Sequence, residues 1–239
     1  MEKSRKVKML SIVALVLAIT GMSLGFAAFS STLTISSSAT VTPNEEDFSI
    51  SFLGTDENGE FTSSTLIYPL LEDGATGSVA TLTGGKSASI SNMNVSFTEP
   101  GQSVTYAYMS LNTGKYDAYF KSWQFRLLSG MSDVIECVPA TNSEVTEELM
   151  YNACEDIDIR YQLLSSNENT LMDGYARENF AVAGTSVVNL GRDFVVTPGD
   201  YGIMVITIEY AGNGDRADGD FEVKIADIIG EYGTAPLSN

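Results

Sequence analysis

Alternation of apolar and polar residues, repeated along most of the chain, is the feature that most limits its fold. Between residues 157 and 163, isoleucine, tyrosine and leucine alternate with aspartate, arginine and glutamine. A period of two residues places the apolar side chains on one face, which predicts strands with one buried face. The same period recurs at residues 33–41, 48–52, 93–97, 104–108, 119–127 and 221–225.

Residues 203–208 are apolar on both faces, which predicts a central strand. Short runs separated by Gly, Pro, Asn and Asp are typical of sandwiches, so we expect an all-β, antiparallel, jelly-roll-like β-sandwich. One short helical insertion is expected around residues 143–153. The segments beginning at Ser96 and Val195 share the order strand, Pro-Gly turn, strand. The residue preferences of β-hairpin turns explain this likeness without a duplication of the sequence.

Two cysteines, Cys137 and Cys154, flank the expected helical insertion. Their even number favours one disulfide if the compartment is oxidising. The loop that it closes would be short, with a chain-entropy contribution of roughly 3 kcal/mol. Two free buried thiols are the alternative.

The N-terminus has the pattern of an export signal. Four basic residues and one acidic residue give residues 1–8 a net charge of +3, and residues 9–29 follow without any charge. A basic region before an apolar stretch that ends in small residues indicates a signal peptide, residues 1–28, ahead of a single domain at 29–239. Twenty-one helical residues also span ~30 Å, so a membrane anchor is the competing interpretation. Gly21 and Gly25 have a spacing that permits close contact between membrane helices.

The run GFAAFSSTLTISSSATV resembles the processing region of TasA/camelysin-like proteins, through Ala27-Ala28-Phe29-Ser30. The resemblance implies cleavage between Ala28 and Phe29 by a signal peptidase of the SipW type. The segment PGQSVTYAYMSLNTGKYDAYF resembles a block of the same proteins, with Gln102 where the family has an acidic residue. The family implies a secreted subunit of extracellular fibres in a biofilm matrix.

The charge and the missing histidine restrict the chemistry. The total charge is −18, so the chain after residue 8 carries −21, which repels nucleic acids and anionic lipids. Camelysin-like proteins are described as metallopeptidases, but a zinc site of the HExxH type needs histidine, and the chain has none. We therefore expect no enzyme and no cofactor. A hydrolase that uses two carboxylates is left open, because the acidic residues are too numerous to single out a pair.

Asn213, Asp215, Asp218 and Asp220 form the best candidate for a cation site. Oxygen ligands at this spacing suit calcium, although their order departs from the EF-hand loop. The alternative is a solvated turn, in which Asn and Asp serve the backbone. A relaxed phosphate-loop pattern at residues 80–87 is followed by strand-like residues rather than by the helix that the motif needs, so we reject it.

Aromatic residues gather between residues 106 and 125. Within residues 119–127, Tyr119, Trp123, Phe125 and Leu127 are expected on one face, with Lys121 as an exception. A sugar-stacking platform is one interpretation of the group Tyr106, Tyr108, Tyr116, Tyr119 and Trp123. Alternation favours core packing instead.

Residues 29–41 form a regular strand pattern with Leu33, Ile35, Ala39 and Val41 on one face. Such a strand can join the sheet edge of a neighbouring copy and build filaments, or fold into its own sandwich as the first strand. A surface module anchored in the membrane through residues 9–29, which binds glycan or protein, is the second hypothesis. In both cases the acidic body lies outside the cell.

Overall fold

The computed structural model of the protein describes residues 47–85, 87–140, 153–167, 169–175, 181–182, 194–212 and 220–234. All of these belong to the larger of the two units into which chain contacts divide the protein, Asn44–Asn239. The expected N-terminal hydrophobic helix, the cleavage position and residues 29–41 lie outside the described residues.

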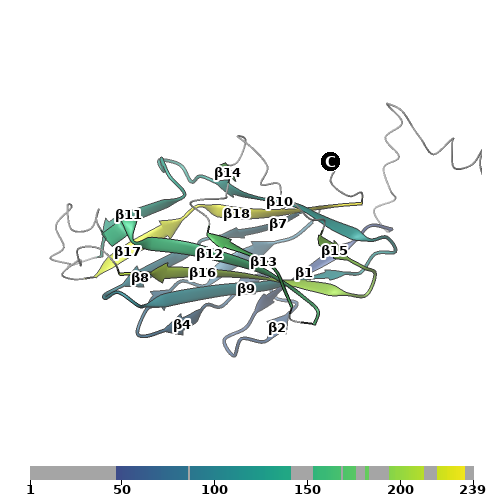
Figure 1. Ribbon diagram of the computed structural model, residues 1–239, viewed down its shortest axis with the longest axis horizontal. Coiled ribbons are helices and arrows are strands. Elements are labelled where there is room, and N and C mark those ends of the chain that lie inside the picture. Colours follow the sequence, from purple (N-terminus) through teal and green to yellow (C-terminus); the bar gives the residue numbers. More distant parts are fainter. Residues whose placement is uncertain are drawn as a thin grey trace, which may run out of the picture. The chain divides into compact units, whose positions relative to one another are not determined.

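The described residues form three sheets (Figure 1). Sheet I contains, in spatial order, β13 (Thr170–Tyr175), β12 (Ile157–Ser165), β16 (Tyr201–Tyr210), β9 (Ser103–Asn112), β1 (Ile50–Thr55) and β2 (Phe61–Thr62), with β4 (Leu70–Glu72) also on β9. Sheet II contains β14 (Ala181–Val182), β10 (Ala118–Arg126), β18 (Asp227–Gly233), β7 (Ser87–Ser91), β6 (Ala80–Thr83) and β3 (Leu66–Ile67), with β15 (Phe194–Val196) also on β10. Sheet III contains β11 (Ile135–Pro139), β17 (Phe221–Ile225), β8 (Asn94–Phe97) and β5 (Thr76–Gly77). Among the described strands only β14 pairs in parallel, with β10, so the prediction of a mostly antiparallel, all-β protein is confirmed.

Sheet III continues sheet II. The order β11-β17-β8 repeats the order β10-β18-β7, and each strand of sheet III is next to its counterpart in sheet II along the chain. Two backbone hydrogen bonds bridge the junction: Ile225 donates to the Met93 carbonyl (3.0 Å), and Ala226 donates to the Val134 carbonyl (2.9 Å). Sheets II and III therefore act as one bent layer.

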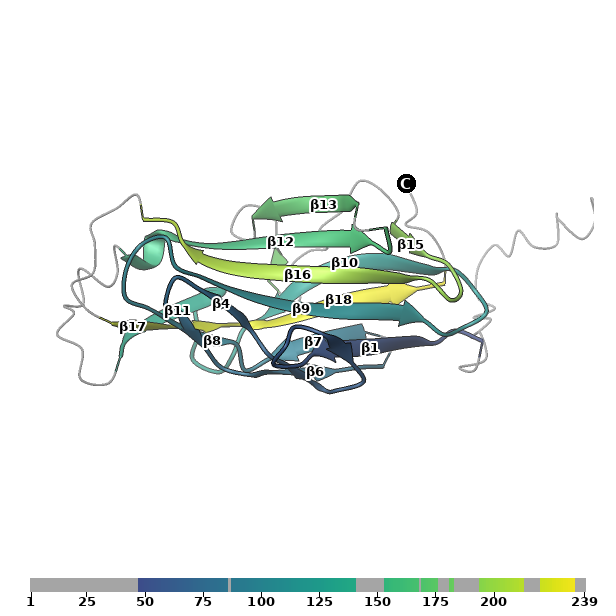
Figure 2. The same ribbon diagram turned by 90° about the horizontal axis from the view of Figure 1, so that it is seen from below.

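Sheet I packs against this bent layer. The rings of Trp123 in β10 and Tyr161 in β12 lie 5.0 Å apart between their centroids, and Tyr210 in β16 lies 5.3 Å from Phe221 in β17. Buried apolar side chains from all three sheets form one core. Aromatic side chains bury the largest areas, so these contacts between the layers contribute strongly to stability. Figure 2 shows β12, β16 and β9 running side by side.

Most of the expected strands are present. In β12 the apolar positions predicted by alternation are buried, and β16 lies between β12 and β9, which confirms the predicted central strand. The expectation for β10 was wrong at one end. A register shift between Phe120 and Ser122 reverses the alternation, so Phe120 and Trp123 both point into the core while Tyr119 does not. This β-bulge also accounts for the outward position of Lys121.

The two Pro-Gly turns are related by reciprocal hydrogen bonds. The Gly101 amide, before β9, donates to the Tyr210 carbonyl at the end of β16 (2.8 Å). The Gly199 amide, before β16, donates to the Asn112 carbonyl at the end of β9 (2.8 Å). Both glycines have positive φ, 95° and 82°, which only glycine adopts without cost. The likeness of the two segments thus follows from their antiparallel pairing with one another.

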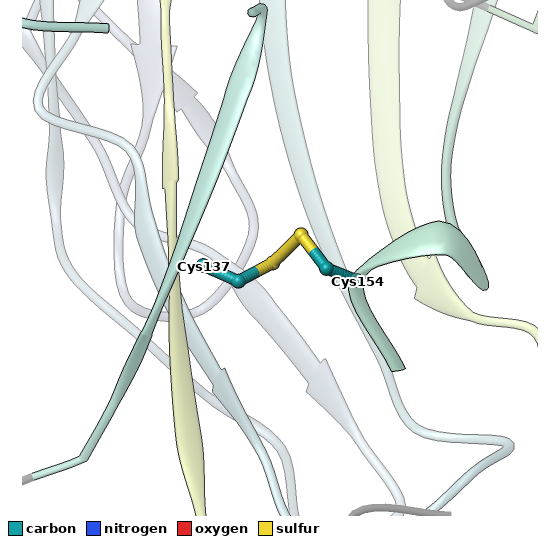
Figure 3. Close-up of a disulfide and its surroundings, with 2 residues drawn as sticks. All are labelled: Cys137 and Cys154. Carbon is teal, nitrogen blue, oxygen red and sulfur yellow. A yellow bond between two sulfur atoms is a disulfide. The ribbon is translucent and has the colours of Figure 1, made fainter. Parts of the chain in front are cut away.

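A disulfide joins Cys137 in β11 to Cys154 in a helical turn at residues 153–155, just before β12 (Figure 3). The predicted disulfide is confirmed, and it links sheet III to the start of a strand in sheet I. Of the helix expected at residues 143–153, residues 143–152 lie outside the described part of the chain.

Candidate functional site

One short segment, residues 61–79, closes one side of the two layers. It contains β2, β3, β4 and β5, which pair with β1, β6, β9 and β8 respectively. Each has a single partner among the described strands, so each leaves one side of its backbone unpaired by a strand. We call residues 61–79 the β2–β5 edge. In Figure 1, β2 and β4 lie along one margin and β14 lies along the other.

Exposed apolar side chains concentrate on the β2–β5 edge. Of the seven large hydrophobic side chains that are exposed in the described residues, four belong to it: Leu66, Leu70, Leu71 and Val79. Leu70 and Leu71 are the most exposed of the four, at 53% and 50%. Native proteins usually protect edge strands with charge, proline or a covering segment, because an open apolar edge invites pairing with another chain.

Leu71 is unusual because it points toward the core and is still half exposed. It lies opposite Val104 in the β4–β9 pair, and residues directly opposite in a pair place their side chains on the same face. Val104 is fully buried. On the opposite layer Gly77 of β5 covers it, since a Cβ at Gly77 would lie 3.0 Å from Val104 Cγ1. Sheet III, which covers Val104, ends at β5. Leu71 lies beyond this end of the sheet and is therefore not covered.

Gln102 fixes the position of β4. Its side chain is almost fully buried, and its Nε2 donates to the Asp73 carbonyl and to Thr98 Oγ1, both at 2.9 Å. Its Oε1 accepts from the Thr98 amide at 2.7 Å. Ser103 Oγ adds a hydrogen bond to Glu72 Oε2 (3.0 Å). A carboxylate at position 102 has no proton for the Asp73 carbonyl, which gives a physical reason for glutamine here.

The aromatic platform considered from sequence does not form. Tyr106, Tyr108 and Trp123 are buried in the core, whereas Tyr116 is exposed and Tyr119 is half-buried on the other face of β10. Core packing was therefore the correct alternative for the three buried residues.

The buried tyrosine hydroxyls have structural partners. Tyr106 donates to the Ser78 carbonyl (2.9 Å), and burial raises the pKa of Tyr106 to about 12. Tyr232 shares a 2.6 Å hydrogen bond with Ser110, and burial raises the pKa of the Tyr232 hydroxyl above its ordinary value. Burial also raises the pKa of Tyr108. These hydroxyls stay protonated at neutral pH and hold the layers together.

Only one of the four candidate cation ligands lies within the described residues. Asn213, Asp215 and Asp218 lie outside the described residues, while Asp220 is exposed just before β17. Within the described ranges, no three His, Cys, Asp or Glu residues are grouped as metal ligands are. At residues 80–87 the chain runs from β6 into β7, so the helix required for phosphate binding is not formed there.

Sequence reasoning did not find the β2–β5 edge. Two adjacent leucines, Leu70 and Leu71, break a period of two, so alternation does not predict β4. Their neighbours Pro69 and Gly74 indicate a turn-rich segment. That combination, adjacent apolar residues between turn residues, was the available signal.

The comparisons with known proteins add no relative. No family model matches the chain, and no curated protein matches it. No helix among the described residues is both long and apolar enough to cross a membrane. The uncharged stretch at residues 9–29 lies outside the described residues.

Proposed function

We propose that this chain is an exported structural protein whose copies join by strand addition into extracellular fibres. Residues 29–41 of one copy extend a sheet of the next copy. The proposal includes a jelly-roll-like topology for the body, release from the leader after Ala28, and no enzymatic activity. It agrees with the resemblance to TasA/camelysin-like fibre subunits.

The observation that carries the proposal is a fixed edge strand, β4, with an inward-pointing leucine half exposed to solvent. An exposed apolar edge of this kind can pair with a strand from another chain. The same chain contains a segment of the right kind, because residues 29–41 alternate apolar and small polar residues and contain no charge. The disulfide between the two layers suits an oxidising compartment outside the cytoplasm.

The test starts from the protein secreted by its own cells. Mass spectrometry of the N-terminus should find Phe29, and electron microscopy should find filaments whose amount rises with concentration. Deletion of residues 29–41 should leave a monomer at every concentration. Filaments formed by the deletion variant would rule out the strand-addition mechanism.

A second candidate is a surface module held in the membrane by residues 9–29, which binds glycan or protein. The length of this uncharged stretch and the spacing of Gly21 and Gly25 favour it. An intact N-terminus at Met1 or Glu2 on membrane-bound, monomeric protein would select this function over the first.

A further inference from the structure

We infer that the outer face of sheet I is a binding surface for a cationic amphipathic helix of another polypeptide. The apolar side of the helix covers an apolar patch that spans β12, β16, β9 and β1. Its lysine or arginine side chains meet carboxylates at the margins of that patch. The inference goes beyond the proposed fibre role and does not depend on it.

The outer face of sheet I carries apolar side chains where an antiparallel sheet that faces water usually carries polar ones. One whole row across the strands is apolar, because its members lie opposite one another in consecutive strand pairs: Leu164, Ile203, Met109 and Leu53. The rows on either side add Val205, Ala107 and Leu111. All seven side chains are partly buried and none is fully buried. We call these seven residues the outer patch.

No described sheet covers the outer patch. Every described strand belongs to sheet I, II or III. The bent layer of sheets II and III packs against the other face of sheet I, where Trp123 meets Tyr161. In Figure 1, β9, β16 and β12 run side by side, so the outer patch is continuous across these strands. A contiguous apolar surface with a polar rim marks an interaction site.

A row of carboxylates lies on the same face, beyond one end of the outer patch. Asp158 in β12 lies opposite Glu209 in β16. Glu209 and Glu72 of β4 both lie opposite Ser103 of β9. This row is two alternation steps from Val205, which is about 14 Å along the strands. Like charges that face one another destabilise a strand pair, so a cation bound between them is favoured.

The other margins add negative charge. The turn between β1 and β2 contains Asp56, Glu57 and Glu60. Among the outward-facing residues in the described strands of sheet I, Arg160 is the only cation, and it forms an ion pair with Asp173. The border of the outer patch is therefore acidic.

Charge and apolar area together select the occupant. A second copy would bring another body of charge −21 to an acidic border, and like charges repel. An amphipathic helix with basic residues instead places an apolar stripe between cations. The four strands of the outer patch span about 14 Å across, which is enough for one helix of about 10–12 Å diameter. A helix of about 18 residues is about 27 Å long and so also reaches the row of carboxylates.

The experiment uses the protein in the N-terminal form that export leaves and a labelled probe peptide of leucine and lysine. The probe has about 18 residues, with leucine at helical spacing. One control peptide has the same composition with leucine and lysine in strict alternation, and the other has glutamate in place of every lysine. Binding is measured by fluorescence anisotropy, oligomeric state by sedimentation, and folding by thermal unfolding.

The first variants remove apolar surface from the outer patch. We expect Ile203→Thr/Met109→Thr to weaken probe binding at least about tenfold, because less apolar area leaves water on binding. Val205→Thr keeps the shape of the side chain and should weaken binding in a smaller degree. It serves as the patch variant if the double variant unfolds. Ile229→Thr is the matched control and should leave binding unchanged, because Ile229 is partly buried on the outer face of sheet II, opposite Gln124.

The second variants remove charge from the border. Asp158→Asn/Glu209→Gln should weaken binding of the probe at least about threefold and make it less dependent on salt. Glu136→Gln/Glu222→Gln removes the same charge from the outward side of sheet III. At physiological salt, charges more than ~8 Å apart are largely screened, so this control should leave binding unchanged.

Three results would overturn the inference. The first is a probe that does not bind, or that binds no better than the two control peptides. The second is binding that the patch variants leave unchanged, which would place the peptide elsewhere on the acidic body. The third is a dimer of the protein alone that Ile203→Thr/Met109→Thr or Val205→Thr dissociates, which would show that a second copy occupies the outer patch.

Discussion

Cys137 and Cys154 join the two layers of the protein: Cys137 lies in β11 of sheet III, and Cys154 lies in the turn that leads into β12 of sheet I. The bond therefore fixes the end of one layer to the beginning of a strand in the other. Seventeen positions separate the two cysteines in the sequence, so the bond also closes a loop in the unfolded chain.

Removing this bond should destabilise the body without abolishing its fold. For a loop of this length the lost constraint on the unfolded chain corresponds to about 3 kcal/mol. We expect Cys137→Ser/Cys154→Ser to lower the free energy of unfolding in urea by that order. Reductant should lower the stability of the wild type and leave the double variant unchanged. Equal stability of the wild type with and without reductant would contradict this account.

Gln102→Glu should destabilise the edge, although it changes one atom. The new carboxylate oxygen would face the Asp73 carbonyl, to which Nε2 now donates at 2.9 Å. Losing a buried donor in this way costs about 1–3 kcal/mol. Gln124→Glu is the control, because Gln124 is half-buried and the hydrogen bond from its amide to Ser122 is long, at 3.4 Å.

The Gln102→Glu penalty should also depend on pH. Burial beside a carbonyl raises the folded-state pKa of the introduced carboxyl above about 4.3, the ordinary value. A raised pKa gives stability that is present below the unfolded pKa and is lost as pH rises through the folded pKa. The difference between variant and wild type should therefore shrink in urea denaturation near pH 4. A difference that stays constant from pH 7 to pH 4 would argue against a carboxylate–carbonyl clash.

Local pattern was sufficient to predict strands whose surroundings are simple. The alternation in β12 follows from burial of one face. The apolar run in β16 correctly indicated a central strand, although its outward face, with Ile203 and Val205, is only partly buried. The register of β10 could not be predicted, because one extra residue between Phe120 and Ser122 reverses every later side chain. Lys121, which breaks the apolar face, was the only indication in the sequence.

The donor segment, residues 29–41, and the acceptor strand, β4, also differ in how far the sequence predicts them. The donor pattern at residues 29–41 is local and is visible in the sequence. The acceptor is not, because β4 pairs with β9 far along the chain, and this pairing decides which of Leu70 and Leu71 faces the core. Whether Leu71 is covered depends on where β5 ends, and β5 pairs with β8, about eighteen residues further along the chain.

Gly230 should not tolerate a side chain. A Cβ at this position in β18 would lie 2.9 Å from the Tyr108 hydroxyl oxygen and 3.1 Å from Trp123 Nε1, both in the core. Overpacking of this kind costs about 1–3 kcal/mol. We expect Gly230→Ala to lower the melting temperature, and Gly230→Ala/Tyr108→Phe to lose less than the sum of the single variants, because phenylalanine removes the nearest atom. Additive losses would show that the two sites do not contact.

Tyr106 should make the protein sensitive to alkali. Its pKa is raised to about 12 by burial, whereas a tyrosine in the unfolded chain ionises near pH 10. The stability that this difference supplies is complete below about pH 10 and is lost as pH rises toward 12, because the unfolded chain releases the proton first. The loss approaches at most about 1.4 kcal/mol per pH unit for one group. Tyr106→Phe should be less stable at pH 8, since the Ser78 carbonyl loses its donor, yet its stability should fall less steeply between pH 10 and 12. Parallel pH profiles of the two proteins in urea denaturation would show that this hydroxyl ionises equally well in the folded and unfolded states.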